Sequence, residues 1–400
     1  MHEVFSRFSW HAGLIDLPWW AYILVGLALT HLTIISVTVF LHRHQAHRAL
    51  DLSPAVSHFF RFWLWLTTAM MTREWVAVHR KHHAKCETVD DPHSPQTRGI
   101  RTVMWKGAEL YRAEAAQKET IERFGHNTPD DWLENRLYSH YRNAGVVVML
   151  AIDYLLFGFA GIALWAVQMM WIPFWAAGVI NGLGHWWGYR NYETPDASRN
   201  IAAFGLLIGG EELHNNHHAF GSSAKFSHRW WEVDLGWGYI RMLQAVGLAK
   251  VKKIAPVPRI LEDKDRIDMD TVRAVVVSRF HVMSEYARDV LLPVLRQEVA
   301  GKPGVYQACL RKTQTLLVRD PGTLDENGRG IVEGVLARFT HLRTVYQFRE
   351  RLQTIWARSS TSHEHLLQAL QEWCQQAEAT GISALEEFAR RLKGYSLQPA

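Results

Sequence analysis

The sequence predicts an all-α integral membrane protein that ends in a soluble helical extension. Three observations support this prediction: two long apolar blocks, a first part rich in histidine and tryptophan, and a charged last part. Of the 400 residues, the first 250 carry 18 of the 22 histidines and 16 of the 18 tryptophans. Residues 251–400 carry 22 Lys or Arg and 18 Asp or Glu. This asymmetry excludes a disordered chain and a single uniform soluble domain.

Residues 19–41 form the first predicted membrane span. The stretch has 23 residues and no charge, and about 20 helical residues suffice to cross the core of a bilayer. Trp19 and Trp20 suit an interfacial aromatic belt. No strongly cationic segment precedes the stretch and no A-x-A site follows it, so we expect a retained span and not a cleaved signal peptide.

Residues 144–184 form the second apolar block, which has 41 residues and one charge, Asp153. This length predicts two spans, with a reversal at residues 157–161, where the sequence FGFAG supplies glycines for a tight turn. A carboxyl group inside a bilayer is costly unless it faces protein or water. We therefore expect Asp153 to make a hydrogen bond between the two helices.

Residues 54–72 are apolar but contain His58 and Arg61. An arginine at the centre of a bilayer costs about 2.5–3.5 kcal/mol on insertion scales. A helix that dips into one leaflet or lies at the interface avoids this cost. The segment is therefore not expected to cross.

Ten histidines occur in four short motifs: HRHQAH (42–47), HRKHH (79–83), NGLGH (181–185) and HNNHH (214–218). On a helix, positions i, i+3 and i+4 share one face, so each H-x-x-H-H motif can direct three imidazoles into one pocket. Neutral imidazole binds iron, zinc, copper and nickel. Three to six ligands saturate one transition metal, so nine or more indicate two neighbouring metals. His44 and His93 suit either a ligand or an ordinary polar residue.

The histidine motifs must lie on one side of the membrane, because side chains reach only a few ångströms. Residues 42–143 carry 15 Lys or Arg, whereas residues 1–18 carry only Arg7. The positive-inside rule then places the motifs in the cytoplasm. We expect three spans, with the N-terminus outside.

These motifs, in this order around an apolar hairpin, resemble the membrane-bound fatty acyl desaturases of the acyl-CoA desaturase type. NGLGH resembles the additional N-x-x-x-H element of that family, and the likeness extends through DPHSP (91–95), WWGYRNY (186–192) and WWEVD (230–234). It covers roughly residues 19–245. The family commonly has four spans, one more than the three expected here.

The resemblance implies a cytoplasmic helical cap that holds two iron ions, with Asn181 holding a metal-bound water and His44 outside the ligand set. Near the motifs, six carboxylates are candidates to orient the ligands: Glu87, Asp90, Asp91, Glu211, Glu212 and Asp234. The implied iron ligands are nine histidines: His42, His47, His79, His82, His83, His185, His214, His217 and His218.

The resemblance also implies the reaction. O2 and two electrons remove two hydrogens from a long acyl chain and leave a cis double bond, most often at position 9. The acyl group would be carried on CoA or in a phospholipid, in a bacterial inner membrane with the active site on the cytoplasmic side. The chain contains no H-P-G-G heme motif and no G-x-G-x-x-G motif. Electrons would therefore come from a separate ferredoxin or flavin reductase.

Residues 256–400 are expected to form a helical domain separate from a desaturase domain at 1–255, with Pro256 and Pro258 at the boundary. The region shows no catalytic motif, and a packing or regulatory role competes with docking of the electron donor or an acyl carrier. Dispersed Lys and Arg give no support for nucleic-acid binding. Apolar residues recur at helical spacing over 268–300, 332–357, 363–377 and 383–394, with breaks at 301–304 and 320–322.

Two other functions fit parts of the pattern. A membrane di-iron hydroxylase of alkanes or lipids uses similar histidine chemistry, although the short motifs match the desaturase pattern better. A metal transporter would place polar residues along the spans, and the two apolar blocks offer few. The three cysteines, Cys86, Cys309 and Cys374, lie far apart, which excludes a disulfide scaffold and a cysteine-ligated cluster.

Overall fold

The computed structural model describes residues 10–300, 313–357 and 362–397, and its described part is mostly helical. The chain divides into two compact units. Unit 1 comprises Met1–Arg190 and Asp196–Ile254, and unit 2 comprises Asn191–Pro195 and Ala255–Ala400. The sequence did not suggest that residues 191–195 would belong to the second unit. Cys309 and the predicted break at 301–304 lie outside the described residues.

Unit 1 is a helical assembly with two short strand pairs. Strand β1 (Leu50–Leu52) is antiparallel to β4 (Ala249–Val251), and β2 (Phe204–Gly205) is parallel to β3 (Val233–Asp234). The helical segments, including three π-helical ones, are α2 (Trp19–Ile35), η1 (Ser36–Ala46), α3 (Pro54–Thr68), α4 (Thr72–Lys85), α5 (Pro95–Arg98), α6 (Ile100–Ala115), α7 (Lys118–Phe124), η2 (Glu134–Tyr138), α8 (Ala144–Ile172), η3 (Pro173–Ile180), α9 (Asn181–Leu183), α10 (His214–Ala219) and α11 (Leu235–Ala245).

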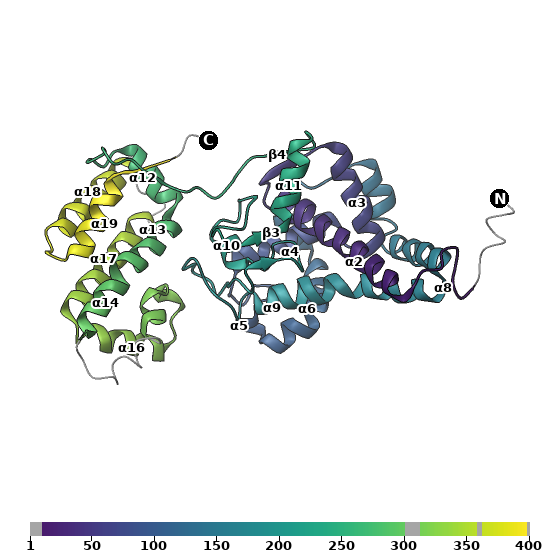
Figure 1. Ribbon diagram of the computed structural model, residues 1–400, viewed down its shortest axis with the longest axis horizontal. Coiled ribbons are helices and arrows are strands. Elements are labelled where there is room, and N and C mark those ends of the chain that lie inside the picture. Colours follow the sequence, from purple (N-terminus) through teal and green to yellow (C-terminus); the bar gives the residue numbers. More distant parts are fainter. Residues whose placement is uncertain (1–9, 301–312, 358–361, 398–400) are drawn as a thin grey trace. The chain divides into compact units, whose positions relative to one another are not determined.

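Two apolar helical stretches, Trp19–Ala46 and Ala144–Leu183, are long enough to cross a membrane. The first contains the predicted span at 19–41 and continues without a break into the first histidine motif. Helices α2 and α8 lie side by side (Figure 1). The exposed apolar side chains of these helices, such as Leu24, Leu27 and Val147, are compatible with a membrane protein.

The second stretch folds back on itself at Gly158, as the sequence predicted. Gly158 has φ 58°, and the returning leg meets the first, since Trp165 Nε1 donates to the Val146 carbonyl at 2.8 Å. Gln168 Nε2 donates to Asp153 Oδ2 at 2.8 Å, which confirms the predicted hydrogen bond between the legs. Any side chain at Gly161 would collide with the backbone of Asp153.

Helix α3 covers most of the ambiguous segment at 54–72. Ser53 caps its first turn and Pro54 occupies the first helical position. The helix has 15 residues, fewer than the about 20 that span a bilayer core. Arg61 is buried against protein and pairs with Asp131 at 2.7 Å, which removes the cost of an isolated arginine.

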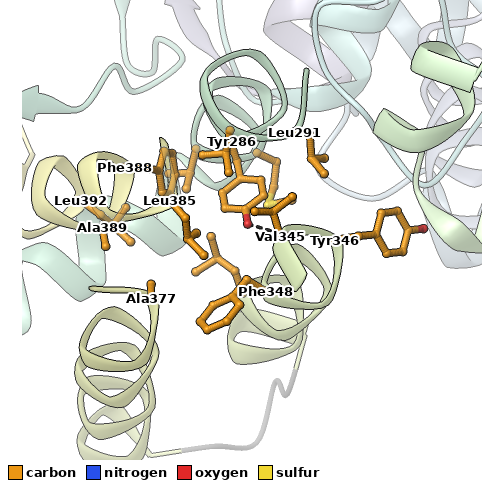
Figure 2. Close-up of a cluster of buried hydrophobic side chains, with 14 of the residues drawn as sticks. Tyr286, Leu291, Val345, Tyr346, Phe348, Ala377, Leu385, Phe388, Ala389 and Leu392 are labelled. Carbon is orange, nitrogen blue, oxygen red and sulfur yellow. Dashed lines mark hydrogen bonds between the residues drawn. The ribbon is translucent and has the colours of Figure 1, made fainter. Parts of the chain in front are cut away.

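In unit 2, a strand near the start of the unit pairs with a strand near its end: β5 (Arg259–Ile260) is antiparallel to β6 (Tyr395–Ser396). Between them, apolar side chains from several helices form one buried cluster, and Tyr286 donates its hydroxyl to the Val345 carbonyl at 2.7 Å (Figure 2). The helices are α12 (Met269–Val277), α13 (Arg279–Tyr286), η4 (Ala287–Leu291), α14 (Leu292–Val299), η5 (Pro321–Thr323), α16 (Glu326–Leu336), α17 (Thr340–Ala357), α18 (His363–Glu378) and α19 (Ser383–Lys393).

The helices predicted at 363–377 and 383–394 are confirmed, but two longer predictions were wrong in detail. The segment 268–300 is broken at Ser278, whose backbone leaves the helical region at ψ 25°. The segment 332–357 belongs to two helices, because Asp325 caps an earlier start and the chain turns between Leu336 and Thr340. Apolar spacing continued across both breaks and therefore concealed them.

Candidate metal centre

The four histidine motifs converge in unit 1. Helix α4 and the short helix α10 each present three histidines, η1 and the residue that ends it present two, and the turn after α9 presents His185. Five of these residues, His42, His82, His185, His214 and His217, are almost completely buried, and His47, His79, His83 and His218 are half-buried. Segments up to 176 residues apart in the sequence thus meet at one place.

The ring nitrogens form two groups, and within each group they lie within 4.8 Å of one another. Both groups consist of histidines only, and together they contain all nine predicted ligands and no other residue. The first group has five members and the second has four: His42, His47, His79, His83 and His217; then His82, His185, His214 and His218.

Within each group, pairs of Nε2 atoms face each other. His47 and His79 approach to 2.8 Å, and His185 and His214 approach to 3.0 Å. Five imidazoles in mutual contact cannot all be satisfied by one another's protons. Nitrogens at such separations can surround an ion, since metal–nitrogen bonds measure about 2.0–2.1 Å for zinc. The geometry therefore fits one metal ion in each group.

Three carboxylates, two of them buried and one half-buried, contact the outer nitrogens of these rings, as the sequence predicted. His82 Nδ1 lies 3.0 Å from Asp91 Oδ1, His185 Nδ1 lies 2.9 Å from Glu87 Oε1, and His42 Nδ1 lies 2.7 Å from Glu211 Oε2. Such contacts fix the tautomer and orientation of an imidazole and raise its basicity as a ligand.

A fourth carboxylate was missed. Asp196 Oδ2 lies 2.9 Å from His218 Nδ1, although the two residues are 22 positions apart and no motif joins them. Among the described residues, His82 Nε2 and His218 Nε2 have no hydrogen-bond partner. Each therefore directs a lone pair into the second group, which is what a metal ligand requires.

Three of the predicted orienting carboxylates contact other groups instead of the histidine ligands. Asp90 pairs with Lys85 at 3.6 Å. Glu212 accepts from backbone N–H groups, including that of Ile208 at 2.9 Å, and so shapes the loop before the third motif. Asp234 pairs with Arg43 at 2.8 Å and caps α11. Glu212 thus holds this loop in place and does not orient a histidine.

The electrostatics favour neutral imidazoles. Burial, together with the neighbouring rings, lowers the pKa of most of the histidines, and it lowers that of His218 to about 4. His82 is the exception, because Asp91 raises its pKa in spite of burial. A neutral ring keeps the lone pair that binds a metal. The pKa is well below its ordinary value for His47, His79, His83, His214 and His217.

His44 and His93, which the sequence left open between a ligand and an ordinary polar residue, lie in different surroundings. His44 belongs to neither group, and its Nδ1 contacts the Leu50 carbonyl at 2.9 Å. His93 lies in a third cluster with His82 and Asp91, and its ring stacks on that of His82 with centroids 4.4 Å apart.

Asn181 begins α9 and lines a cavity of about 780 Å³. His42 and His79 of the first group and His214 of the second line the same cavity. Its remaining walls are mostly apolar, for example Val37 and Ile172. A long apolar molecule in this cavity can therefore reach both histidine groups.

Exposed apolar helices, two all-histidine groups that could each hold a metal ion and an apolar cavity beside them are the features of a metal-dependent enzyme and are compatible with a membrane protein. The family model described as fatty acid desaturase matches residues 17–244, more than half of the chain. The chain belongs to the fatty acid desaturase family. It is an oxidoreductase that desaturates fatty acyl groups, which confirms the prediction from the histidine motifs.

Several relatives support the same assignment. The chain is 30% identical to Delta-9 acyl-lipid desaturase 1 of Arabidopsis thaliana, over 59% of this chain and 76% of that one. It is 30% identical to the sn-1 stearoyl-lipid 9-desaturase of Synechocystis, over 62% and 74%. It is 33% identical to the icosanoyl-CoA 5-desaturase of Limnanthes douglasii, over 62% and 67%.

A second family model, described as a transposase, matches residues 271–397 in unit 2. This match covers less than half of the chain and gives a likeness of that region alone. Among the described residues, groups of side chains able to hold a metal ion occur only in unit 1. The candidate metal chemistry of the chain therefore belongs to unit 1.

Proposed function

We propose that unit 1 introduces a cis double bond into a long-chain fatty acyl group with two iron ions held by the nine histidines. The observation that carries this proposal is the separation of these histidines into two adjacent groups beside one apolar cavity. Bound iron would supply the activation of O2 that an unactivated carbon chain requires. Asn181 lines the cavity beside both groups and would hold a metal-bound water.

The chain's own residues have three tasks in this proposal. The histidines bind the ions without neutralising their charge, and this favours an electrophilic centre. Glu87, Asp91, Asp196 and Glu211 fix the ring orientations. The cavity walls hold the acyl chain in register and keep water away from the reacting carbons.

We further propose position 9 for the double bond and either acyl-CoA or a phospholipid as the acyl carrier. Two relatives are named as acyl-lipid 9-desaturases and one as a CoA-ester 5-desaturase. The carbonyl end of the substrate is chemically similar in both carriers, so the same cavity suits either.

The proposed topology has three spans, with the iron site on the cytoplasmic side of a bacterial inner membrane and the N-terminus outside. The apolar stretches and the reversal at Gly158 support it. The first leg of the hairpin, residues 144–157, is short for a span by itself. In this topology α3 does not cross and its Arg61 remains against protein.

Unit 1 is proposed as the desaturase domain, and unit 2 as a packing or regulatory domain. The electrons are proposed to come from a separate ferredoxin or flavin reductase.

Expression of the full chain in a host without oxygen-dependent desaturation, together with an electron donor, tests the proposal. Gas chromatography of the lipids should show a new cis alkene, separately measured in CoA esters and phospholipids. His217→Ala should abolish it, whereas His44→Gln, in the first histidine motif but outside both groups, should not. An alcohol in place of the alkene would indicate the hydroxylase alternative. An unchanged lipid profile, or fewer than one iron per chain in a fully active preparation, would contradict the proposal.

A further inference from the structure

Tyr111 lines the cavity, and the metal site does not account for its buried hydroxyl group. The residue lies on α6 and lines the cavity with Ala108 and Ala115 of the same helix. Its hydroxyl oxygen is inaccessible to solvent and has no hydrogen-bond partner among the described residues. A buried hydroxyl without a partner is costly, so a ligand that supplies an acceptor would be favoured here.

Two charged side chains mark the surroundings of this hydroxyl. Glu74 and Arg142 line the same cavity, and Arg142 Nη2 lies 2.7 Å from Glu74 Oε2. Burial first, and the negative charge of Glu74 second, raise the pKa of Tyr111. The hydroxyl therefore stays protonated and can act as a donor. Glu74 and Arg142 pair with each other, and the hydroxyl makes no hydrogen bond to either of them.

Glu74, which belongs to the charged pair, is offset from the histidine His79 along the cavity wall. Glu74 and His79 both face the cavity from α4, and five helical residues advance about 7.5 Å along the axis. The wall between them is formed by Trp75 and Val78. A chain bound along this wall would present one polar end near Tyr111 and an apolar carbon near the histidines.

We infer that Tyr111 donates a hydrogen bond from its hydroxyl to the carbonyl oxygen of the acyl group, and so sets which carbon pair meets the metal site. The carbonyl is the one acceptor that a saturated acyl chain keeps whether a thioester or an ester carries it. Tyr111 is thus a positioning residue that determines the position of the double bond. This inference rests on the proposed function.

Removal of the hydroxyl tests the inference without changing the size of the ring. Tyr111→Phe should give a mixture of positional isomers and roughly a three- to tenfold lower kcat/KM, the cost of one hydrogen bond, at unchanged iron content. Tyr141→Phe is the matched control, because Tyr141 is 54% exposed and outside the cavity lining. Double-bond positions are read by mass spectrometry of the fatty acids. A single unchanged isomer with unchanged kcat/KM would overturn the inference.

A change in the substrate gives a second measurement that does not depend on the folding of a variant. The thioether analogue of acyl-CoA and the ether analogue of the phospholipid lack the carbonyl. The wild-type protein should process the natural carrier at least threefold better than its analogue, and Tyr111→Phe should lose this preference. A preference that persists in Tyr111→Phe would overturn the inference. A wild-type protein that makes no alkene would instead overturn the proposed function.

Discussion

The interiors of the two units differ in kind. Unit 1 contains a polar interior of histidine rings, the carboxylates that orient them and the buried Arg43–Asp234 pair, and its buried apolar residues form separate clusters. The centre of unit 2 is one continuous apolar cluster that includes Tyr286 and Phe388 (Figure 2). Trp373 belongs to the same cluster. Apolar burial stabilises a fold directly, whereas buried polar groups cost free energy unless each has a partner.

The two units should therefore owe their stability to different interactions. Unit 2 has the core of an ordinary helical domain. Unit 1 leaves ring nitrogens such as His82 Nε2 and His218 Nε2 without partners among the described residues. A bound ion offsets that cost, because metal binding and folding are coupled. Four experiments test this contrast.

Removal of the metal should have the largest effect. A chelator should abolish desaturation and accelerate hydrogen exchange in α4 and α10, since these helices supply six of the nine histidines. Exchange in α17, α18 and α19 should not change, because they form the apolar core of unit 2. Mass-spectrometric exchange before and after iron is restored provides the measurement. Equal acceleration in both sets of helices would contradict the contrast.

A large truncation in unit 2 should give the opposite pattern. Trp373 is 1% exposed and donates from Nε1 to the Phe348 carbonyl at 2.9 Å. Trp373→Ala should cost about 3–5 kcal/mol of unfolding free energy, from lost burial and the cavity that remains. Exchange should rise in α17 to α19 while iron content stays constant. Loss of iron from this variant would show that unit 1 depends on the core of unit 2.

Loss of one orienting carboxylate should have a moderate effect that is confined to unit 1. Asp196→Asn removes the charge that holds His218 and should lower iron affinity or activity by about 10–100-fold. Asp90→Asn is the matched control, because Asp90 pairs only with the exposed Lys85 in the described contacts. Iron titration of both variants gives the answer, and equal affinities would remove Asp196 from the site.

The smallest effect is expected at the start of α12. Asp268 caps this helix by accepting from Thr271 N at 2.8 Å. Desolvation opposes ionisation, but hydrogen bonds from Lys264 and Thr271 prevail and lower the pKa of Asp268 from 3.8 to about 2. A lowered pKa means that ionised Asp268 stabilises the folded state at pH values above its ordinary pKa of 3.8. This contribution is lost as the pH falls through about 2.

Asp268→Ala should therefore cost about 1 kcal/mol near neutral pH, and the difference from the wild-type protein should narrow as the pH drops below 4. Hydrogen exchange of residues 269–277, compared between the two proteins at several pH values, measures the loss of stability near neutral pH and its decrease at low pH. A difference that does not vary with pH would show that the charge of Asp268 contributes nothing.

The sequence predicted much of this protein because its strongest patterns are local. The reversal at Gly158 follows from two apolar runs around glycines, and Asp153 has its expected partner in Gln168. Helix breaks such as Ser278 escaped prediction, since apolar residues keep their spacing across them. Asp196 escaped because a loop, and no repeat in the sequence, brings it to His218.

By itself, the sequence determined which residue types could form a metal site, because helical spacing places histidines of one motif on one face. Only the tertiary structure decided how these histidines are divided between the two groups. Neighbouring His82 and His83 enter different groups, and so do His217 and His218, because consecutive side chains on a helix diverge and meet rings from different segments. The partners Asp196 and Glu87 and the free hydroxyl of Tyr111 were likewise decided by packing between distant segments.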